Sequence, residues 1–149
     1  MKTDNIDKLR LKVTHNLTEI LDMRGALKQK DLEYHDMMKK FFLSIIDVLD
    51  SFERKEENLK EKYLDKIEGV EKIIKSYSSI QKKLVNILAS HAITKLDFPE
   101  NKLIVGFSRV VETAPDSKLP ADTIISIVRN GYVRGSEVIR EAELIIVKN

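Results

Sequence analysis

The chain has 149 residues, no cysteine, and 34% charged residues that sum to a formal net charge of only +2. The absence of cysteine excludes disulfides, thiolate metal sites and a cysteine nucleophile. Because acidic and basic residues are interspersed and aromatic residues are few, the composition argues against a nucleic-acid-binding surface. The sequence contains neither an apolar run long enough to span a bilayer nor a signal-peptide pattern, so we expect a soluble cytoplasmic protein.

An apolar or aromatic side chain recurs at every seventh residue from Ile6 to Val48. The members of this column are Ile6, Val13, Ile20, Leu27, Tyr34, Phe41 and Val48. A straight α-helix drifts against a seven-residue repeat, so a sustained column predicts a helix wound around a partner helix. Ile45 and Phe52 widen the stripe toward its C-terminal end. The alternative is that the helix buries this stripe against its own chain, but so long an element outruns the core available to it.

No proline interrupts the helical pattern from Ile6 to about Glu57, and Asp4 can cap its first turn. Gly25 is the weak point of this helix, since glycine costs about 1 kcal/mol relative to alanine in a helix interior. Residues 53–62 are almost wholly charged and lack apolar periodicity. This stretch is either an exposed helical segment or a hinge between two helices, and the sequence leaves both readings open.

A second amphipathic helix is expected over residues 62–90, with Gln81 as the one polar break in its apolar stripe. The stripe consists of Ile67, Val70, Ile74, Tyr77, Leu84 and Leu88. Each chain then has two amphipathic helices, and two chains together would form a four-helix bundle.

The pattern changes at His91, after which prolines, most of the glycines and short β-branched runs appear. We predict strands at residues 103–105, 108–113, 123–129 and 143–147. The pair Asn130-Gly131 predicts a tight turn directly after one of them. We therefore expect an α+β protein with a helical dimerisation domain over residues 1–91 and a small all-β domain over residues 92–149.

No constellation of side chains indicates catalysis or cofactor binding. The three histidines, His15, His35 and His91, have no partner at metal-ligand spacing and are expected on helix surfaces. No phosphate-binding glycine loop or activated serine is present, so we predict neither an enzyme nor direct nucleotide binding. The arginines after residue 128 are expected to form a generic basic rim on the β domain.

Three stretches of the sequence, at consistent separations, resemble the GrpE family of nucleotide exchange factors for DnaK-type chaperones. The first, residues 48–54, reads VLDSFER and is similar to the family's V-L-D-N-L-E-R. The second, residues 68–71, reads EGVE and is similar to E-G-V/I-E. The third combines the NGY at residues 130–132 with VIREA at residues 138–142, similar to K-G-Y and L-R-P-A. Together they span almost the whole chain.

The resemblance implies a homodimer with parallel long helices, a four-helix bundle, and a β domain on each protomer. It also implies binding to the nucleotide-binding domain of a DnaK-type chaperone, which is opened so that ADP leaves, with no cofactor involved. The dimer interface would comprise the column together with Ile45, Phe52, Ile67, Ile74 and Leu84. The alternative function is a dimeric coiled-coil adaptor or structural protein that lacks exchange activity.

The motif matches also imply which residues contact the chaperone. These residues are Arg54, Leu103, Val128, Glu137, Arg140 and Ile146. The chain departs from the family where it usually has L-D-P-x-x-H, since residues 103–108 here read LIVGFS. Glu137 stands where the family often has arginine, so we expect it to face a basic or neutral patch on its partner.

Overall fold

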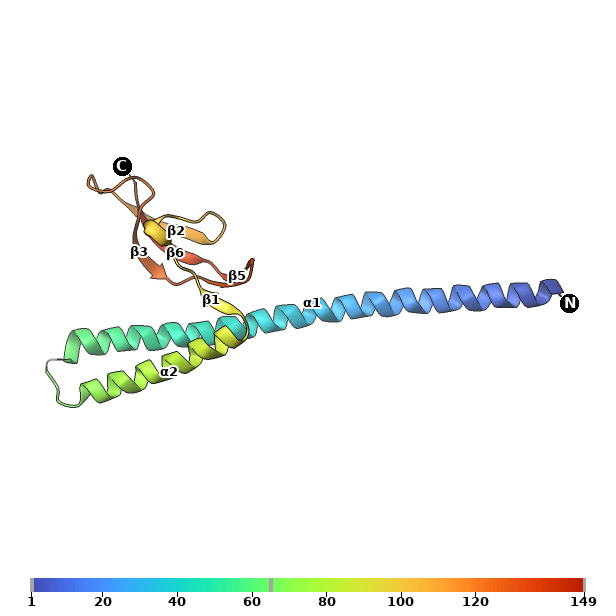
Figure 1. The fold of residues 1–149 in the computed structure, drawn as a ribbon, viewed down its shortest axis with the longest axis horizontal. Helices are drawn as coiled ribbons and strands as arrows, with labels where there is room; N and C mark the ends of the chain where they lie inside the picture. Colours follow the sequence, from blue (N-terminus) through green and yellow to red (C-terminus); the bar gives the residue numbers. More distant parts are fainter. Residues whose placement is uncertain (1, 65, 149) are drawn as a thin grey trace. The chain divides into compact units, whose positions relative to one another are not determined.

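The computed structural model describes residues 2–64 and 66–148, and side chains from residue 5 onward. The chain divides into two units, Met1–Lys40 and Phe41–Asn149. The helix α1, Lys2–Tyr63, contributes to both. The prediction of an α+β fold with a long N-terminal helix, a second helix and a small β region is confirmed (Figure 1).

The first unit consists of helix alone. Its described side chains are exposed except for Met38 and Lys39, which are half-buried. The column residues there are between 47% and 62% exposed within the single chain, with Ile20 and Leu27 at the two extremes. An amphipathic helix gains most of its stability by burying its apolar face, so this unit has an apolar stripe without a cover in its own chain.

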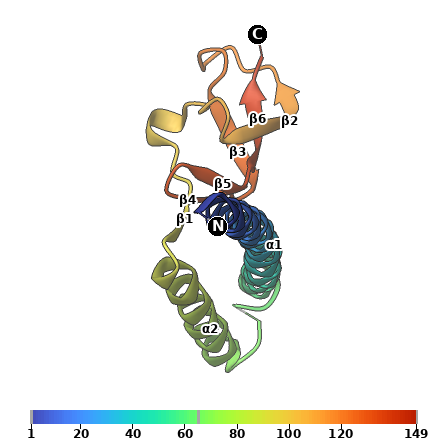
Figure 2. The ribbon, with the colours of Figure 1, turned by 90° about the vertical axis from the view of Figure 1, so that its right-hand side faces the viewer.

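The second unit begins with a helical hairpin, in which α2, Val70–Ser90, lies antiparallel beside residues 41–63 of α1 (Figures 1 and 2). The seam between the two helices is marked by Phe52 and Tyr77, whose ring centres lie 5.4 Å apart, and by Ser78, which donates to Glu56. Phe42, Ile46 and Leu49 of α1 are at most 1% exposed, and Val70, Ile74 and Leu88 of α2 are buried as well. Residues 53–62 are helical to Tyr63, so the hinge alternative at this stretch is wrong and the chain turns afterward.

The second helix begins at Val70 rather than at residue 62 as expected. Lys66 and Ile67 donate their backbone N–H groups to the Tyr63 carbonyl at 3.1 Å, which closes the end of α1. Gly69 then adopts a φ of 90°, a conformation that glycine reaches without a steric penalty, and α2 starts at the next residue. The helical spacing of apolar residues continues through the sequence of this turn, so the pattern gave no sign that the helix is interrupted there.

The β region contains two three-stranded sheets. The smaller has the order β1-β4-β5 and is antiparallel throughout. Its strands are β1 (Ile93–Lys95), β4 (Tyr132–Arg134) and β5 (Glu137–Arg140). The larger has the order β2-β6-β3, with β6 parallel to β2 and antiparallel to β3. Its strands are β2 (Ser108–Ala114), β3 (Ile124–Arg129) and β6 (Ala142–Val147).

The core of the β region lies against the central strand β6. Ala142, Leu144 and Ile146 alternate along that strand and are buried together with Phe98 and Ile124. Half-buried Leu96, Leu103 and Ile104 pack around this cluster. This cluster draws all its described members from residues after 92. Ile93, Tyr132 and Ile139 of the smaller sheet are buried outside it, and Ile93 and Tyr132 line a hollow with Leu88 of α2.

Three predictions about the β region need correction. The three strands of the smaller sheet were missed, because segments of three or four residues are too short for a period to emerge. Residues 103–105 are not a strand; they follow the 3₁₀ turn Pro99–Asn101 and lead into a turn closed by Phe107 N–H to the Ile104 carbonyl.

The third correction concerns Asn130-Gly131, which is not a hairpin turn. It links β3 of the larger sheet to β4 of the smaller one, and these two strands are not paired. The tight hairpin joins β4 to β5 through Gly135, whose φ is 59°. Gly131 is required for a different reason: a Cβ atom there would lie 2.5 Å from Leu96 Cδ1 and 2.7 Å from the Ala142 nitrogen.

Candidate functional site

The C-terminal part of α1 carries three sets of side chains in different surroundings. Phe42, Ile46 and Leu49 are buried, Asp47 and Asp50 bind side chains of the β region, and the column residues remain exposed. Successive residues of a helix advance by about 100°, so Phe41 and Val48 of the column point away from Asp50, whereas Ile46 lies within about 40° of it. The β region and the exposed column thus use different sides of the same helix.

A cluster of six polar residues, which we call the clasp, joins α1 to the β region. It consists of Asp47, Asp50, Glu53, Arg129, Asn130 and Arg140. Arg140 of β5 is its centre: its Nη1 and Nη2 atoms donate to Asp50 Oδ2 and Oδ1 at 2.6 and 2.9 Å. The Arg140 and Asp50 side chains are only 8% and 13% exposed. Such a bidentate arginine–carboxylate pair fixes orientation as well as distance.

Arg140 also binds the backbone of the segment that connects the two sheets. Its Nε and Nη2 atoms donate to the Asn130 carbonyl at 3.0 and 2.8 Å. The Asn130 side chain donates to Glu53 Oε2 at 3.0 Å, one turn along α1 from Asp50. The guanidinium lies 5.3 Å from the centre of the Tyr132 ring, where a cation–π contact is favourable. Arg140 therefore ties β5, the connecting segment and α1 to one another.

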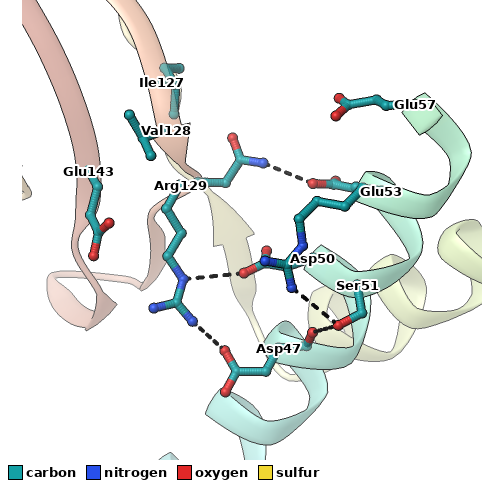
Figure 3. A pocket seen from close by; sticks show the side chains of 11 residues that line it. Asp47, Asp50, Ser51, Glu53, Glu57, Ile127, Val128, Arg129 and Glu143 are labelled. Carbon is teal, nitrogen blue, oxygen red and sulfur yellow. Dashed lines mark hydrogen bonds and ion pairs between the residues drawn. The ribbon is translucent and has the colours of Figure 1, made fainter. Parts of the chain in front are cut away.

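Arg129, at the end of β3, provides the outer part of the clasp. Its Nη2 atom donates to Asp47 Oδ1 at 2.6 Å and its Nε atom to Asp50 Oδ2 at 3.3 Å (Figure 3). Burial by itself would lower the pKa of Arg129, but the hydrogen bond to Asp50 and the charges of Asp47 and Asp50 outweigh it, so the pKa is raised. Asp50 thus accepts from both arginines.

The expected basic rim is therefore wrong in its central feature. Arg129 and Arg140 are neutralised by carboxylates of α1 instead of presenting free positive charge. The two residues also belong to different sheets, β3 and β5. The sequence held a signal for this arrangement, because Asp50 and Arg140 both fall in stretches that match family motifs.

A cavity of about 550 Å³ lies beside the clasp, lined by the helix and by the end of β3 (Figure 3). Arg54 and Val128, both predicted to contact a chaperone, line it together. Val128 is 56% exposed and Ile127, also on its wall, is 43% exposed. Arg54 donates from Nη2 to Ser51 Oγ at 3.5 Å. The site therefore combines two exposed apolar groups and an arginine with a largely acidic lining, which consists of Asp47, Asp50, Glu53, Glu57 and Glu143.

The other predicted chaperone-contact residues lie elsewhere. Ile146 is 6% exposed and belongs to the core of the β region, and Leu103 is half-buried against the same core. Glu137 is half-buried at the start of β5, opposite Arg134 in the register. Arg140 is occupied by the clasp. Of the six residues, the structure brings Arg54 and Val128 to one exposed cavity.

The predicted dimer residues fall into two groups. The column residues are all about half or more exposed, as a surface awaiting a partner requires. Ile45, Phe52 and Leu84 are half-buried, and Ile67 is exposed in the turn. Ile74 is 8% exposed, because it packs in the hairpin seam of its own chain.

A second apolar stripe, which the sequence analysis missed, runs along α2. Ile73, Ile80 and Ile87 recur at every seventh residue and are 49%, 41% and 44% exposed. Their spacing was visible in the sequence, but the neighbouring seam residues obscured it. Helix geometry turns this stripe and the column residues of the hairpin, Phe41 and Val48, away from the seam in senses that coincide for antiparallel helices. Both stripes therefore lie on the same side of the hairpin.

A polar layer inside the seam explains the break at Gln81. Glu56, only 8% exposed, accepts hydrogen bonds from Lys60 Nζ at 2.6 Å and from Ser78 Oγ at 3.0 Å. The Lys60 hydrogen bond lowers the pKa of Glu56, burial opposes it, and Ser78 and Gln81 add to the lowering. This layer belongs to the packing of the hairpin, and Glu56 Oε2 and Gln81 Nε2 are buried in it without a hydrogen-bond partner among the described residues.

The described residues contain no group of three or more histidine, cysteine, aspartate or glutamate side chains that could hold a metal ion. Among the helices in the same part of the chain, none is long and apolar enough to cross a membrane. The features that remain are surfaces: an exposed apolar stripe on each helix, and an apolar rim with an arginine beside the clasp.

Comparison with known proteins gives one consistent result. A model of the GrpE family matches residues 1–148. A protein named Protein GrpE from Bradyrhizobium diazoefficiens is 28% identical over 80 residues, covering 54% of this chain and 40% of that protein. One from Rhodopseudomonas palustris (strain TIE-1) is 23% identical over 137 residues, covering 89% and 66%. One from Francisella philomiragia is 28% identical over 114 residues, covering 75% and 56%. The chain thus spans from 40% to 66% of the length of these relatives.

Proposed function

Because this chain belongs to the GrpE family of non-enzymatic co-chaperones, we propose that it is a nucleotide exchange factor for a DnaK-type chaperone. It binds the chaperone's nucleotide-binding domain, favours its open form and so promotes ADP release, in the cytoplasm and without a cofactor. The family match over residues 1–148 is the observation that carries this proposal.

The surface around the cavity is the part that would meet the chaperone. Val128 and Ile127 present exposed apolar groups there, and Arg54 supplies a cation from the next turn of α1 after Asp50. Burying such groups at an interface supplies the hydrophobic driving force, while an arginine adds directional hydrogen bonds. Glu137 and Leu103 remain predicted contacts, with Glu137 set against a basic or neutral patch.

The protein would act as a homodimer in which residues 1–91 form the dimerisation domain and residues 92–149 the chaperone-binding domain. The exposed column on α1 and the Ile73, Ile80 and Ile87 stripe on α2 support this arrangement, because they share one side of the hairpin. A second hairpin placed there would cover both stripes and complete a four-helix bundle. The parallel direction of the two long helices comes from the family resemblance.

The mechanism is a shift of population and involves no bond formation. A factor that binds the open, nucleotide-free form of the chaperone more tightly than the closed form raises the fraction of open molecules. The shift can be no larger than the ratio of the two affinities. ADP then dissociates faster because the closed form that retains it is less populated.

The experiment is the release of fluorescent ADP from the organism's own DnaK-type chaperone after mixing with the intact chain. We expect release to accelerate, and Val128→Asp to reduce the effect roughly tenfold because it puts an unpaired charge into an apolar interface. Val111→Asp is the matched control, since Val111 is 44% exposed on the opposite edge strand β2. No acceleration by the unmodified chain would favour the adaptor alternative.

A further inference from the structure

We propose that the clasp is a positioning device, which holds the β region at a fixed orientation on α1 so that binding to a partner is converted into opening of that partner. This inference rests on the exchange function proposed above and assigns roles within it. Asp50 and Arg140 are the positioning residues, and Asp47, Glu53, Arg129 and Asn130 support them. None of the six needs to touch the chaperone for this role.

The bonding of Arg140 supplies the rigidity that the proposal requires. A planar guanidinium held by both oxygens of Asp50 and by the Asn130 carbonyl has its position and its plane determined at once. Arg129 adds a second attachment to Asp47, about one turn earlier on the same face of α1. Asn130 adds a third attachment to Glu53, on the following turn. The β region is therefore attached by hydrogen bonds to three successive turns of α1.

The clasp adds directional bonds to apolar contacts between the two parts, since Ile93 and Tyr132 of the smaller sheet line a hollow with Leu88 of α2. The apolar cluster around β6 is separate from the helices. Its members, Phe98, Ile124, Ala142, Leu144 and Ile146, all follow residue 92. Apolar packing is non-directional, whereas charge-assisted hydrogen bonds fix angles. The directional bonds of the clasp therefore fix the angle of the β region on α1 beyond what apolar contacts alone would, and they can be weakened without removing the cluster around β6.

Rigid attachment has a direct consequence for exchange. A factor that fits the open chaperone and clashes with the closed one owes its differential affinity to the fixed angle between its two contact surfaces. If the β region could swing, it would follow the closing lobe and bind both forms comparably. Loosening the clasp should therefore lower the maximal acceleration of ADP release more than it lowers the affinity for the chaperone.

The first test measures orientation directly and requires no chaperone. The chain has no cysteine, so cysteines introduced at exposed Lys83 of α2 and exposed Glu112 of β2 can carry two spin labels without competing sites. Labelled protein is mixed with an excess of unlabelled chain so that only distances within one chain are measured. We expect a narrow distance distribution that broadens in Arg140→Lys, which keeps the charge but loses the bidentate geometry.

The matched control is Arg109→Lys, which alters the exposed pair between Arg109 and Glu143 of the larger sheet. We expect it to leave the distance distribution unchanged. A broad distribution in the unmodified chain would overturn the proposal even if Arg140→Lys did not fold. So would a distribution that Arg140→Lys leaves as narrow as before.

The second test is the dependence of ADP release on the concentration of the factor. For Arg140→Lys we expect the maximal acceleration to fall roughly tenfold, with the half-saturating concentration changed less than about threefold. Asp50→Glu, which retains the carboxylate, should keep more of the maximal acceleration of ADP release than Asp50→Asn, which loses it. Loss of affinity with an unchanged maximum would show that Arg140 contacts the chaperone and would overturn the positioning role. If the unmodified chain does not accelerate release, the exchange function fails while the distance measurement still decides the rigidity of the joint.

Discussion

Asp50 and Arg140 are 90 residues apart in the chain, and two hydrogen bonds of 2.6 and 2.9 Å join their side chains. Both groups are nearly buried, so each charge depends on the other for compensation. Asp50 lies in the VLDSFER stretch at the end of the column, and Arg140 in the VIREA stretch before the last strand. Two motifs that the sequence presents separately therefore form one contact between helix and sheet.

The first prediction follows from the burial of this pair. Asp50→Ala leaves the Arg140 guanidinium buried beside fewer acceptors, and removal of one partner from a buried pair typically costs about 3–5 kcal/mol. Arg109→Ala removes a more exposed pair and should cost about 0–1 kcal/mol. Urea unfolding at one fixed protein concentration measures both, since a dimer's stability depends on concentration. Equal losses in the two variants would contradict the central role of Asp50 and Arg140.

The second prediction compares one substitution at two glycines. Gly131→Ala places a methyl group 2.5 Å from Leu96 Cδ1 and 2.7 Å from a backbone nitrogen, so it should destabilise the protein by at least about 1–3 kcal/mol. Gly25→Ala meets no atom within 4 Å and should stabilise α1 by about 1 kcal/mol. The melting temperature measured by circular dichroism should thus fall in Gly131→Ala and rise in Gly25→Ala. If the melting temperatures of both variants moved in the same direction, the surroundings assigned to one of the two glycines would be wrong.

The third prediction concerns Tyr132, which lies under the Arg140 guanidinium. Burial raises the pKa of Tyr132 to about 12, and the charges of Glu53 and Asp50 add to the rise. The unfolded chain loses this proton near the ordinary value of 10.0, so stability falls as the pH increases from there toward about 12. Tyr132→Phe should remove that part of the loss. Unfolding free energies at about pH 9 and about pH 11 measure it, with ultraviolet titration of tyrosinate as a direct check on the pKa.

A decline of stability that is the same in Tyr132→Phe as in the unmodified chain would mean that another group titrates. Tyr34, which is 61% exposed in the first unit, provides the matched control. Tyr34→Phe should leave the alkaline decline intact, because the contact between Tyr132 and Arg140 stays in place.

The fourth prediction tests the exposed column of α1 as the face that meets a second chain. Val48 is 48% exposed, and Val48→Asp should shift the protein toward monomer because a charge enters the face proposed for the second chain. Val105→Asp, at a turn position that is 85% exposed, should leave the assembly unchanged. Sedimentation at micromolar concentration measures both. A compact monomer for the unmodified chain would refute the dimer.

Long-period features could be predicted from the sequence, and short-range ones could not. The seven members of the column were sufficient to predict α1, and its exposed side chains agree with a stripe that needs a partner. The start of α2 was misplaced because Gly69 interrupts a pattern whose period continues across it. Strands of three residues, such as Tyr132–Arg134, carry too few positions to show an alternation.

The clasp could be predicted only in part, for a different physical reason. Sequence motifs singled out Arg140 and the stretch containing Asp50, but a motif does not say whether a residue faces a partner or its own chain. That depends on which elements meet in space, and here β5 meets α1. Glu53 and Asn130 also lie in motif-matching stretches, VLDSFER and NGY, but those stretches did not indicate that the two residues bind each other. Ile73, Ile80 and Ile87 were visible as a repeat, but only burial separates them from the seam residues.

The central claim is that this chain distinguishes the open form of a DnaK-type chaperone from the closed one. Titration calorimetry with the intact chain and the full-length cognate chaperone tests it, once without nucleotide and once with saturating ADP. The account predicts binding at least about tenfold tighter without nucleotide, since only a difference in affinity can drive release. Equal affinity in the two titrations would contradict it, however tight the binding.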